Sequence, residues 1–380
     1  MKIAVVSPYD YAYPGGVVVH INNLYRELKE LGSSVRIITP YSGNIESISN
    51  NDVIPVGKPV PIPSGGSVAR VTLSPFLTST LQSILERERF DVVHLHEPLC
   101  SSITLTALYE SNTINVGTFH ACHKASVGYK MTSPVLQIFF NRLHGKIAVS
   151  KPAKDFVSRY FLPSDFTIIP NGIDIEYFSS PIMSINNYRD GKLNILFVGR
   201  MEKRKGLKYL IQAFEIVKRE MPNTRLIVVG PGDRRIYEQM VRKAGLEDVV
   251  FTGYVTNDEL PPYYHLADVF CSPATGEESF GIILLEAMAA SKPVVASSIS
   301  GYKSVMTDGV EGLMAPPKNV PALADALIRV LKDEPLRRQF SIRGRETAER
   351  YSWPNVAKSV YEYYLSLLDA HASKKIKMVQ

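Results

Sequence analysis

The chain has 380 residues, and because a single hydrophobic core seldom extends beyond about 250–300 residues, this length predicts two domains. Hydrophobic residues make up 45% and charged residues 21%, a balance that excludes disordered and fibrous proteins. Lysine and arginine (43) exceed aspartate and glutamate (37), and this net charge of +6 fits an anionic ligand or surface without indicating nucleic acid.

Membrane-spanning and secreted proteins are the next classes that the sequence argues against. No stretch approaches the roughly 18 consecutive apolar residues that a spanning helix needs. The apolar run 2–7 is short and ends at Pro8, so it predicts a buried strand and not a signal peptide.

Cysteine and histidine spacing gives no sign of a disulfide or a metal site. The cysteines are isolated in the sequence, so we expect reduced thiols. They are Cys100, Cys122 and Cys271. His94, His96 and His120 lack the spacing of zinc ligands, and we therefore expect no metal.

Short β-branched runs alternate with longer amphipathic segments in the first part of the chain. Residues 15–31 have apolar side chains at helical spacing and are followed by Gly32, so they predict a helix. Strands separated by such crossover helices indicate a parallel, doubly wound sheet. The predicted strands are 2–7, 35–39, 91–94, 115–119, 146–149 and 166–169.

Residues 179–192 are polar and have no periodicity, so they form the predicted linker. The same alternation begins again after them and predicts a second α/β domain. Its predicted strands are 194–198, 225–229, 249–251, 269–271 and 293–296, and its helices are 207–220, 235–244 and 281–290. A last amphipathic helix follows Trp353 and Pro354, and we expect residues 371–380 to be frayed.

Two short segments after predicted strands are candidate ligand sites. Gly15 and Gly16 precede the first helix, and glycines let a backbone approach a ligand while a helix N-terminus favours an anion. The motif is not G-x-G-x-x-G, and an ordinary turn is the alternative. His120 follows the strand 115–119, where a ligand-binding and a purely structural histidine both stay open.

The loop 199–206 contains four cations within six positions, between a strand and a helix. These are Arg200, Lys203, Arg204 and Lys205. Arginine offers a fork for phosphate oxygens and lysine a point charge. Because cations at a helix N-terminus are unfavourable unless an anion binds there, an anion site is favoured over a solvated basic loop. The sequence is not that of a P-loop.

The segment 276–286 combines a helix start with two carboxylates. Phe280, Gly281 and Ile282 are expected to begin the helix and to present free N–H groups to a phosphate. Glu286 lies in the apolar run IILLEAMAA, where a charge is costly unless it binds a polar group such as two ribose hydroxyls. A solvent-facing carboxylate is the alternative.

Together these loops resemble the retaining nucleotide-sugar glycosyltransferases of family 4, of the group 1 type. The most specific part is the pair Glu278 and Glu286 with residues 279–281 between them. Arg200 and Lys205 match the basic pair of the family. The segments 15–16, 118–120 and 170–174 match as well, so the resemblance extends over nearly the whole chain.

The resemblance implies an α/β architecture, the GT-B fold, with two Rossmann-like doubly wound domains that face a cleft. The C-terminal helix crosses back, so the acceptor-side domain is residues 1–180 plus 355–380 and the nucleotide-sugar domain is residues 190–354. The reaction is expected to need no cofactor and no metal. The acceptor is expected to attack the same face of the hexose from which the phosphate leaves.

The resemblance also implies roles for the candidate residues. Arg200 and Lys205 offset the charge of the leaving diphosphate, and Glu278 and His120 contact the hexose, which makes these four the expected catalytic residues. The expected donor-binding residues are Gly16, Arg200, Lys205, Val255, Glu278, Phe280, Gly281, Ile282 and Glu286. In that set Glu286 is expected at the ribose, and the loop 253–257 beside the base.

Further segments are similar to those members of the family that mannosylate phosphatidylinositol. They are residues 7–9, 14–17, 60–63, 66–70, 94–98 and 276–281. This similarity implies a GDP-mannose donor, a phosphatidylinositol-like acceptor, and a cytoplasmic enzyme that is peripheral at the inner face of the cell membrane. There are two departures: Val18 replaces a glutamine that would help bind inositol, and the helix predicted within 74–89 is less basic than a lipid-gripping helix.

The acceptor is expected to contact Tyr9 and Arg70, and the loop 62–71 is either a bilayer contact or an ordinary surface loop. A second interpretation keeps the fold but uses a UDP-sugar and a soluble sugar or polysaccharide acceptor. A nucleotide-sugar binding module without turnover is a third, although the intact charged residues argue against it. Nucleic-acid binding is disfavoured because the net charge is weak and aromatic and basic residues are not interleaved.

Overall fold

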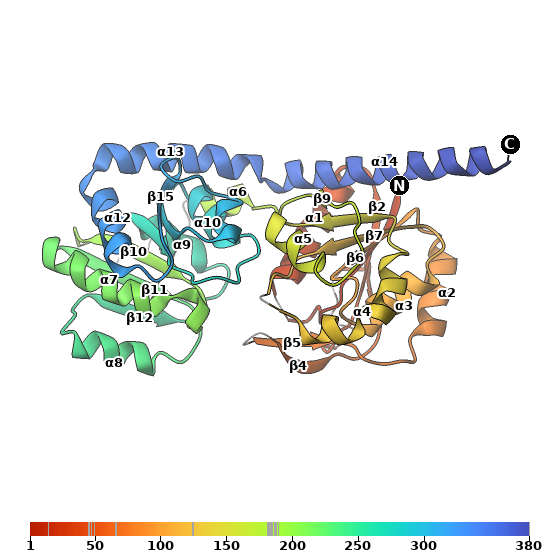
Figure 1. Ribbon diagram of the computed structural model, residues 1–380, viewed down its shortest axis with the longest axis horizontal. Helices are drawn as coiled ribbons and strands as arrows, with labels where there is room; N and C mark the ends of the chain where they lie inside the picture. The colour runs from red at the N-terminus through yellow and green to blue at the C-terminus, as the bar shows by residue number, and fades with distance from the viewer. Residues whose placement is uncertain are drawn as a thin grey trace. The chain divides into compact units, whose positions relative to one another are not determined.

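The computed structural model describes residues 1–13, 15–44, 46, 48, 50–64, 67–123, 125–180, 185, 188 and 190–379 (Figure 1). The chain divides into two compact units, Met1–Gly172 with Trp353–Gln380 (unit 1) and Ile173–Ser352 (unit 2). The sequence-based ranges, 1–180 plus 355–380 and 190–354, end the first segment of unit 1 eight residues too late, begin unit 2 17 residues too late and place the return to unit 1 two residues too late. A cleft between the units stays a prediction.

Unit 1 contains a seven-stranded sheet in the order β3-β2-β1-β6-β7-β8-β9, and every neighbouring pair is parallel. The strands are β1 (Lys2–Val6), β2 (Ser34–Thr39), β3 (Val53–Pro55), β6 (Val92–His96), β7 (Ile114–Phe119), β8 (Gly145–Ala148) and β9 (Thr167–Ile168). The expected parallel, doubly wound sheet is confirmed, and β3 is an edge strand that the sequence pattern did not indicate.

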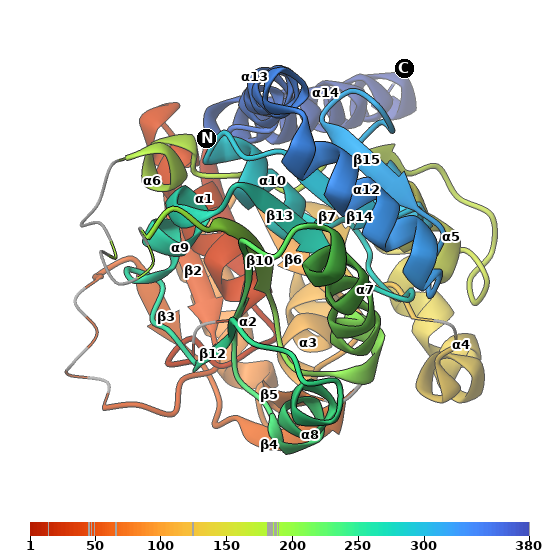
Figure 2. The ribbon, with the colours of Figure 1, turned by 90° about the vertical axis from the view of Figure 1, so that its left-hand side faces the viewer.

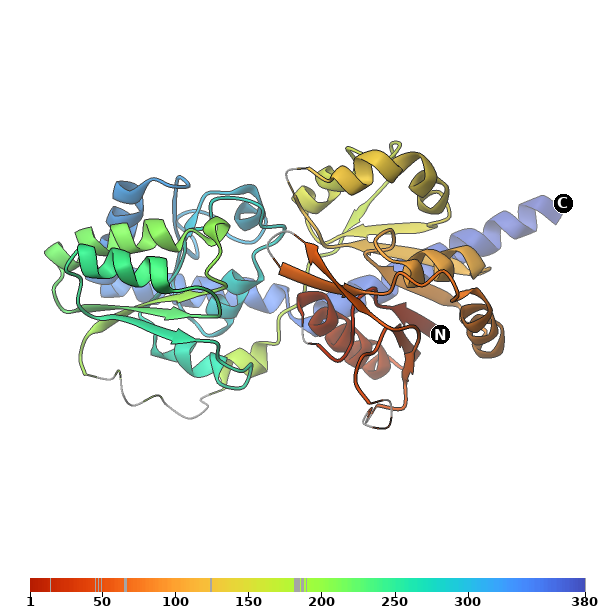
Figure 3. The same ribbon diagram turned by 90° about the horizontal axis from the view of Figure 1, so that it is seen from below.

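Helices cover both faces of this sheet. They are α1 (Gly16–Glu30), α2 (Thr78–Glu88), α3 (Ser102–Glu110), α4 (Val127–Phe140), α5 (Lys151–Val157) and α14 (Trp353–Val379). Apolar side chains of α2, α3, α4 and α5 share one core, and those of α1 and α14 share the other; the two groups of helices can be followed in Figure 3. The tail expected to be frayed is helical through Val379, which corrects that prediction, because its alanine and lysine residues favour helix.

The segment expected as a loop at 62–71 is instead part of an antiparallel hairpin. Strands β4 (Val60–Ser64) and β5 (Ser67–Val71) pair along their length, and the predicted glycine tip, 65–66, lies outside the described residues. Prolines at 61 and 63 are tolerated in this hairpin, because both strands of a two-stranded ribbon are edge strands.

Unit 2 contains a six-stranded parallel sheet in the order β12-β11-β10-β13-β14-β15. The strands are β10 (Leu193–Val198), β11 (Thr224–Val229), β12 (Val249–Gly253), β13 (Val269–Ser272), β14 (Val294–Ser297) and β15 (Gly312–Ala315). The predicted strands lie within one or two residues of β10 to β14, whereas β15 was not predicted. Half of the residues of the linker predicted at 179–192 lie outside the described residues.

The helices of unit 2 include a pair, α7 and α12, that lie against each other in Figure 2. The helices are α6 (Ile175–Ser179), α7 (Leu207–Glu220), α8 (Arg235–Lys243), α9 (Leu260–Leu266), α10 (Ile282–Ala289), α11 (Ser300–Lys303), α12 (Val320–Lys332) and α13 (Glu334–Arg350), with a 3₁₀ turn η3 (Lys203–Lys205). Among the described helices of the chain, none combines the length and apolar composition needed to cross a bilayer.

The strand order explains where each unit can bind a ligand. In unit 1 the strand β1 lies between β2 and β6, and in unit 2 the strand β10 lies between β11 and β13. In each sheet, the chain therefore first adds strands on one side of the central strand, β1 or β10, and then adds strands on its other side. Loops that leave the carboxyl ends of strands at such a reversal diverge, and open α/β sheets bind ligands there.

Gly206 joins η3 to α7 and holds two loops of unit 2 together. Its φ is +76°, and a Cβ at this position would lie 1.9 Å from the carbonyl oxygen of Pro273. Gly309 has a similar φ of +79° but has open space around it.

We predict that Gly206→Ala lowers the free energy of unfolding by more than Gly309→Ala does. Gly309→Ala, the control, loses only the free energy that a left-handed backbone costs a non-glycine residue, about 1–3 kcal/mol. Gly206→Ala has that cost and a clash with the backbone of Pro273 as well. Urea unfolding of both variants measures the difference. Equal losses would show that the contact with Pro273 does not constrain the loop.

Candidate functional site

In unit 2 the candidate site is built from two loops that follow neighbouring strands. Residues 199–206 connect β10 to α7, and residues 273–281 connect β13 to α10. The backbone N–H and the hydroxyl of Thr275 both donate to the carbonyl oxygen of Arg204, over 2.8 and 3.2 Å. Since these bonds join the two loops, the basic residues of one lie beside the carboxylates of the other.

The carboxylate of Glu278 is the centre of this charge cluster. Its Oε1 accepts from Nη1 of Arg204 and from Nζ of Lys205, each over 2.7 Å. Arg204 also binds Glu202 over 2.8 Å, while Nη1 of Arg200 lies 3.6 Å from Oε1 of Glu202 and its side chain is 56% exposed. The structure thus brings Lys205 and Glu278 together and leaves Arg200 at the surface.

Arg204 is a member of this cluster that the sequence did not single out. Because four cations lie in one loop, the sequence alone does not indicate which of them contact Glu278. Lysine has three N–H donors and arginine five, so Arg204 and Lys205 can bind further acceptors when Glu278 is bound. The cluster can therefore accommodate an additional anion.

Helix α10 points its N-terminus at the same place. It begins at Ile282, one residue after the predicted start at 281, so Phe280 and Gly281 precede the helix. Gly281 is the N-cap residue, with a φ of +93°, and no side chain caps the helix. The N–H groups of the first turn therefore remain available to an anion. Phe280 itself is buried against Tyr351, so only its backbone can contact a ligand.

Glu286 lies on α10 and is partly buried, so the solvent-facing alternative is wrong. Its Oε2 accepts a hydrogen bond from the hydroxyl of Tyr264 over 2.6 Å. Burial raises the pKa of this carboxyl, while the Tyr264 hydroxyl and the charge of Lys205 lower it. Because the carboxylate can accept further hydrogen bonds, it suits a ligand that carries hydroxyl groups.

Val255 lies in the loop after β12 and is partly buried, next to the exposed Tyr254. The backbone carbonyl of Asn257 in this loop accepts a hydrogen bond from the hydroxyl of Tyr177 on α6. The main chain of this loop is therefore held to α6.

In unit 1 the equivalent position is the start of α1. Gly16 is its first residue, exposed, with no side-chain cap on Gly15 and no acidic residue in the first turn. These N–H groups are also available to an anion. Val18, two residues further along, is buried in the core and its side chain offers no polar group.

His120 belongs to a cluster of histidines that the sequence did not bring together. Its Nε2 shares a proton with Nδ1 of His96 over 2.9 Å, and His20 donates from Nδ1 to Oδ1 of Asn171 over 3.0 Å. His94 bonds to Thr118 and to Tyr364, 2.6 Å in each case. His20 comes from α1 and Tyr364 from α14, so no local motif could reveal the cluster.

Burial makes all four imidazoles poor bases. It lowers the pKa of His20 to about 4 and that of His94 to about 3, and it lowers the pKa values of His96 and His120 well below 6.5. His120 is therefore neutral near pH 7 and acts as a hydrogen-bonding group and not as a cation. Its partner His96 fixes which nitrogen carries the proton.

The nitrogens of His20, His96 and His120 lie within 4.8 Å of one another, which is close enough to consider a metal ion. The two nitrogens of His96 and His120 that are 2.9 Å apart already share a proton, however. Ligand nitrogens around a tetrahedral zinc ion lie about 3.3 Å apart, so this pair fits a hydrogen bond better than a metal. The expected absence of a metal stays a prediction.

Glu97 connects this cluster to the loop after β7. One of its carboxylate oxygens accepts from the backbone N–H groups of His120 and Ala121, over 2.7 Å each. Burial raises its pKa, and the two backbone hydrogen bonds oppose that shift. Glu97 has a φ of +45°, which marks a constrained turn that positions His120.

Tyr9 and Arg70, the predicted acceptor contacts, are neighbours. Tyr9 bridges to Val71, and the backbone N–H of Asp10 donates to the carbonyl of Arg70 over 2.9 Å. The guanidinium of Arg70 lies 3.8 Å from the ring centre of Tyr13. This stacking holds a cation beside a phenol at the carboxyl end of β1.

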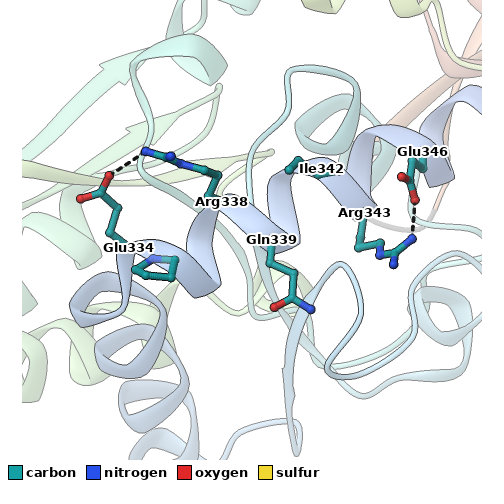
Figure 4. Close-up of a pocket in the computed structure, with 7 residues that line it drawn as sticks. Glu334, Arg338, Gln339, Ile342, Arg343 and Glu346 are labelled. Carbon is teal, nitrogen blue, oxygen red and sulfur yellow. Dashed lines mark hydrogen bonds and ion pairs between the residues drawn. The ribbon is translucent and has the colours of Figure 1, made fainter.

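A separate hollow of about 730 Å³ lies along α13 (Figure 4). Its lining residues are Glu334, Pro335, Arg338, Gln339, Ile342, Arg343 and Glu346. Glu334 pairs with Arg338 and Arg343 with Glu346, so the charges are compensated within one helix. Because no second element contributes a lining residue, this hollow lacks the converging polar groups of a ligand site.

The buried histidines predict a loss of stability of unit 1 in acid. A histidine with pKa 6.5 in the unfolded chain takes up a proton before its buried counterpart does, so stability falls as the pH drops below 6.5 towards about 4. Each such histidine contributes up to about 1.4 kcal/mol per pH unit.

We expect His20→Gln to show a shallower fall than the wild type in urea unfolding at pH 7.5, 6.0 and 5.0. His123→Gln, at an exposed position, is the matched control and should follow the wild type. An unchanged slope in His20→Gln would contradict the assignment.

Comparison with known proteins assigns the chain to a family. Residues 14–177 match Glycosyltransferase Family 4 and residues 180–347 match Glycosyl transferases group 1. The chain is 36% identical to a phosphatidyl-myo-inositol mannosyltransferase of Mycobacterium leprae, over 96% of each chain. It is 34% identical to the enzyme of that name from Mycolicibacterium smegmatis, over 96% of this chain and 93% of the relative.

The fold is also found among solved structures. Anabaena Alr3699/HepE in complex with UDP superimposes with a TM-score of 0.78 at 20% identity, over 96% of this chain and all of the other. The predicted GT-B fold, with two Rossmann-like parallel sheets and a C-terminal helix that belongs to unit 1, is confirmed. The roles of the individual site residues stay predictions. The chain belongs to the group 1, family 4 glycosyltransferases.

Proposed function

We propose that the chain transfers mannose from GDP-mannose to the inositol ring of phosphatidylinositol, at the cytosolic face of the membrane. The observation that carries this proposal is the 34–36% identity, over 96% of this chain, to relatives named phosphatidyl-myo-inositol mannosyltransferase. The charge cluster of unit 2 supports a nucleoside diphosphate donor, because it offers two cations and a helix N-terminus to one anion.

The donor half of the reaction is assigned to unit 2. Arg200 and Lys205 bind the diphosphate with the N–H groups of residues 280–282. Glu286, already oriented by Tyr264, accepts from the ribose hydroxyls. The main chain around Val255 contacts the base.

Binding of the diphosphate changes the partner of Lys205. Without donor, Lys205 and Arg204 both bind Glu278. A diphosphate carries more negative charge than a carboxylate, so it recruits the ammonium group and leaves Arg204 to hold Glu278. Oε2 of Glu278, which neither cation contacts, is the oxygen assigned to accept from the hexose hydroxyls.

The transfer itself is assigned as a same-face displacement that retains the anomeric configuration. The bond from C1 of mannose to the β-phosphate oxygen breaks, and a bond from C1 to an inositol oxygen forms. The inositol proton passes to the departing phosphate oxygen, so GDP is released. Arg200 and Lys205 offset the charge that develops on that phosphate, and neutral His120 hydrogen-bonds to the hexose.

The acceptor half is assigned to Tyr9 and Arg70. The cation of Arg70, held on the ring of Tyr13, suits the phosphate of the lipid head group. Buried Val18 cannot hydrogen-bond to the inositol, so other groups must orient the ring.

We expect the purified chain to add one hexose to phosphatidylinositol in vesicles when GDP-mannose is supplied. Mass spectrometry of the lipid product, with GDP-glucose and UDP-glucose in parallel, makes the measurement. Transfer only from a UDP-sugar, or only onto soluble sugars, would contradict this proposal and favour an enzyme that uses a UDP-sugar and a soluble acceptor.

Arg70→Ala separates the acceptor role from the donor role in the same assay. The KM for phosphatidylinositol should rise about tenfold, as loss of one phosphate contact implies, while hydrolysis of GDP-mannose changes less than twofold. Arg87→Ala, an exposed arginine on α2, serves as the control. Equal losses of transfer and hydrolysis in Arg70→Ala would contradict the acceptor assignment.

A further inference from the structure

The outward face of α4 carries an unusual stripe of exposed apolar side chains. Val127, Met131, Val135 and Ile138 are each between 61% and 76% exposed. Their spacing of four, four and three residues places them on one side of the helix. In Figure 3 this helix is the yellow one at the edge of unit 1.

The stripe is not needed to hold α4 on its sheet, because the opposite face of the helix already does so. Leu136 and Phe140 are buried there, and the rings of Phe140 and Phe161 stack with centroids 4.8 Å apart. Tyr129 packs against Phe156 of α5. A helix that is apolar on both faces is covered on both in its working state.

The apolar surface continues beyond the helix. Leu162, 66% exposed, is held beside α4 because its backbone N–H donates to Oε1 of Gln137 over 2.9 Å. Pro134 is exposed between the residues of the stripe. Pro134 and Leu162 therefore extend the exposed apolar surface of the stripe.

The segment of the chain that contains α4 is positively charged. Residues 111–164 contain seven lysines and arginines but a single acidic residue, Asp155. The rest of residues 1–180 has eight basic and thirteen acidic residues, so this segment stands out within the first half of the chain. Lys130 and Lys151 are exposed, and neither takes part in an ion pair within the described part of the chain.

Helix α2, which corresponds to the lipid-gripping helix of the similar family members, lacks both properties. The exposed face of α2 consists of polar residues such as Ser79, Gln82 and Ser83, and its buried residues are Leu81 and Ile84. The two arginines near its end are accompanied by two glutamates. α2 therefore offers a bilayer neither apolar area nor net charge.

We propose that the apolar stripe of α4 docks on an anionic lipid bilayer. The stripe enters the boundary between head groups and acyl chains, and the surrounding lysines bind lipid phosphates. A second copy of this chain is a poorer occupant, because a symmetric contact would bring two positively charged segments together. The docking does not depend on which sugar is transferred or which lipid accepts it.

Cosedimentation of the full-length chain with vesicles tests the proposal. The vesicles contain phosphatidylcholine alone or with phosphatidylglycerol, and no phosphatidylinositol or donor, so the result is independent of transferase activity. The wild type should bind the phosphatidylglycerol vesicles and should be released by salt. Ile138→Glu should weaken this binding at least tenfold.

Ile236→Glu on α8 is the matched control, because Ile138 and Ile236 are both isoleucines on helices and both 63% exposed. It should bind within twofold of the wild type, and both variants should unfold at the wild-type temperature. Equal binding of Ile138→Glu and wild type, or an equal loss in Ile236→Glu, would overturn the proposal. A wild-type dimer that Ile138→Glu dissociates, with vesicle binding unchanged, would also overturn it.

Discussion

The interaction on which the unit 2 site depends is the contact of one carboxylate with two cations. Glu278 accepts from Arg204 and Lys205 over 2.7 Å each, beside the N-terminus of α10. Cations and a helix N-terminus in one place repel each other unless an anion joins them. Glu278 supplies that negative charge and joins the two loops through Arg204 and Lys205.

The fold produces this arrangement from two glycine-dependent loops. Gly206 lets the basic loop approach Pro273, and Thr275 then joins it to the loop that carries Glu278. Because β10 and β13 are adjacent and parallel, both loops leave the same edge of the sheet. In unit 1 the comparable edge holds a neutral histidine, His120, which is oriented by its hydrogen bonds with His96 and Glu97.

Sequence periodicity predicted regular elements well and long-range contacts poorly. Helix α7 has the predicted bounds, since its apolar stripe begins directly after a glycine and ends before a proline-containing turn. The β4–β5 hairpin was not predicted, because Pro61 and Pro63 make the sequence of β4 atypical of a strand. The partners of His120 and the contact between Arg204 and Glu278 depend on residues far apart in sequence, so spacing alone could not reveal them.

Calorimetric titration of GDP against Glu278→Gln tests the central claim most directly. If the carboxylate competes with the diphosphate for Lys205, its neutralisation should leave GDP affinity equal to or several-fold above that of the wild type, while GDP-mannose should lose its advantage over GDP. Lys205→Ala should weaken both ligands by tenfold or more. A fall in GDP affinity in Glu278→Gln as large as in Lys205→Ala would contradict the account.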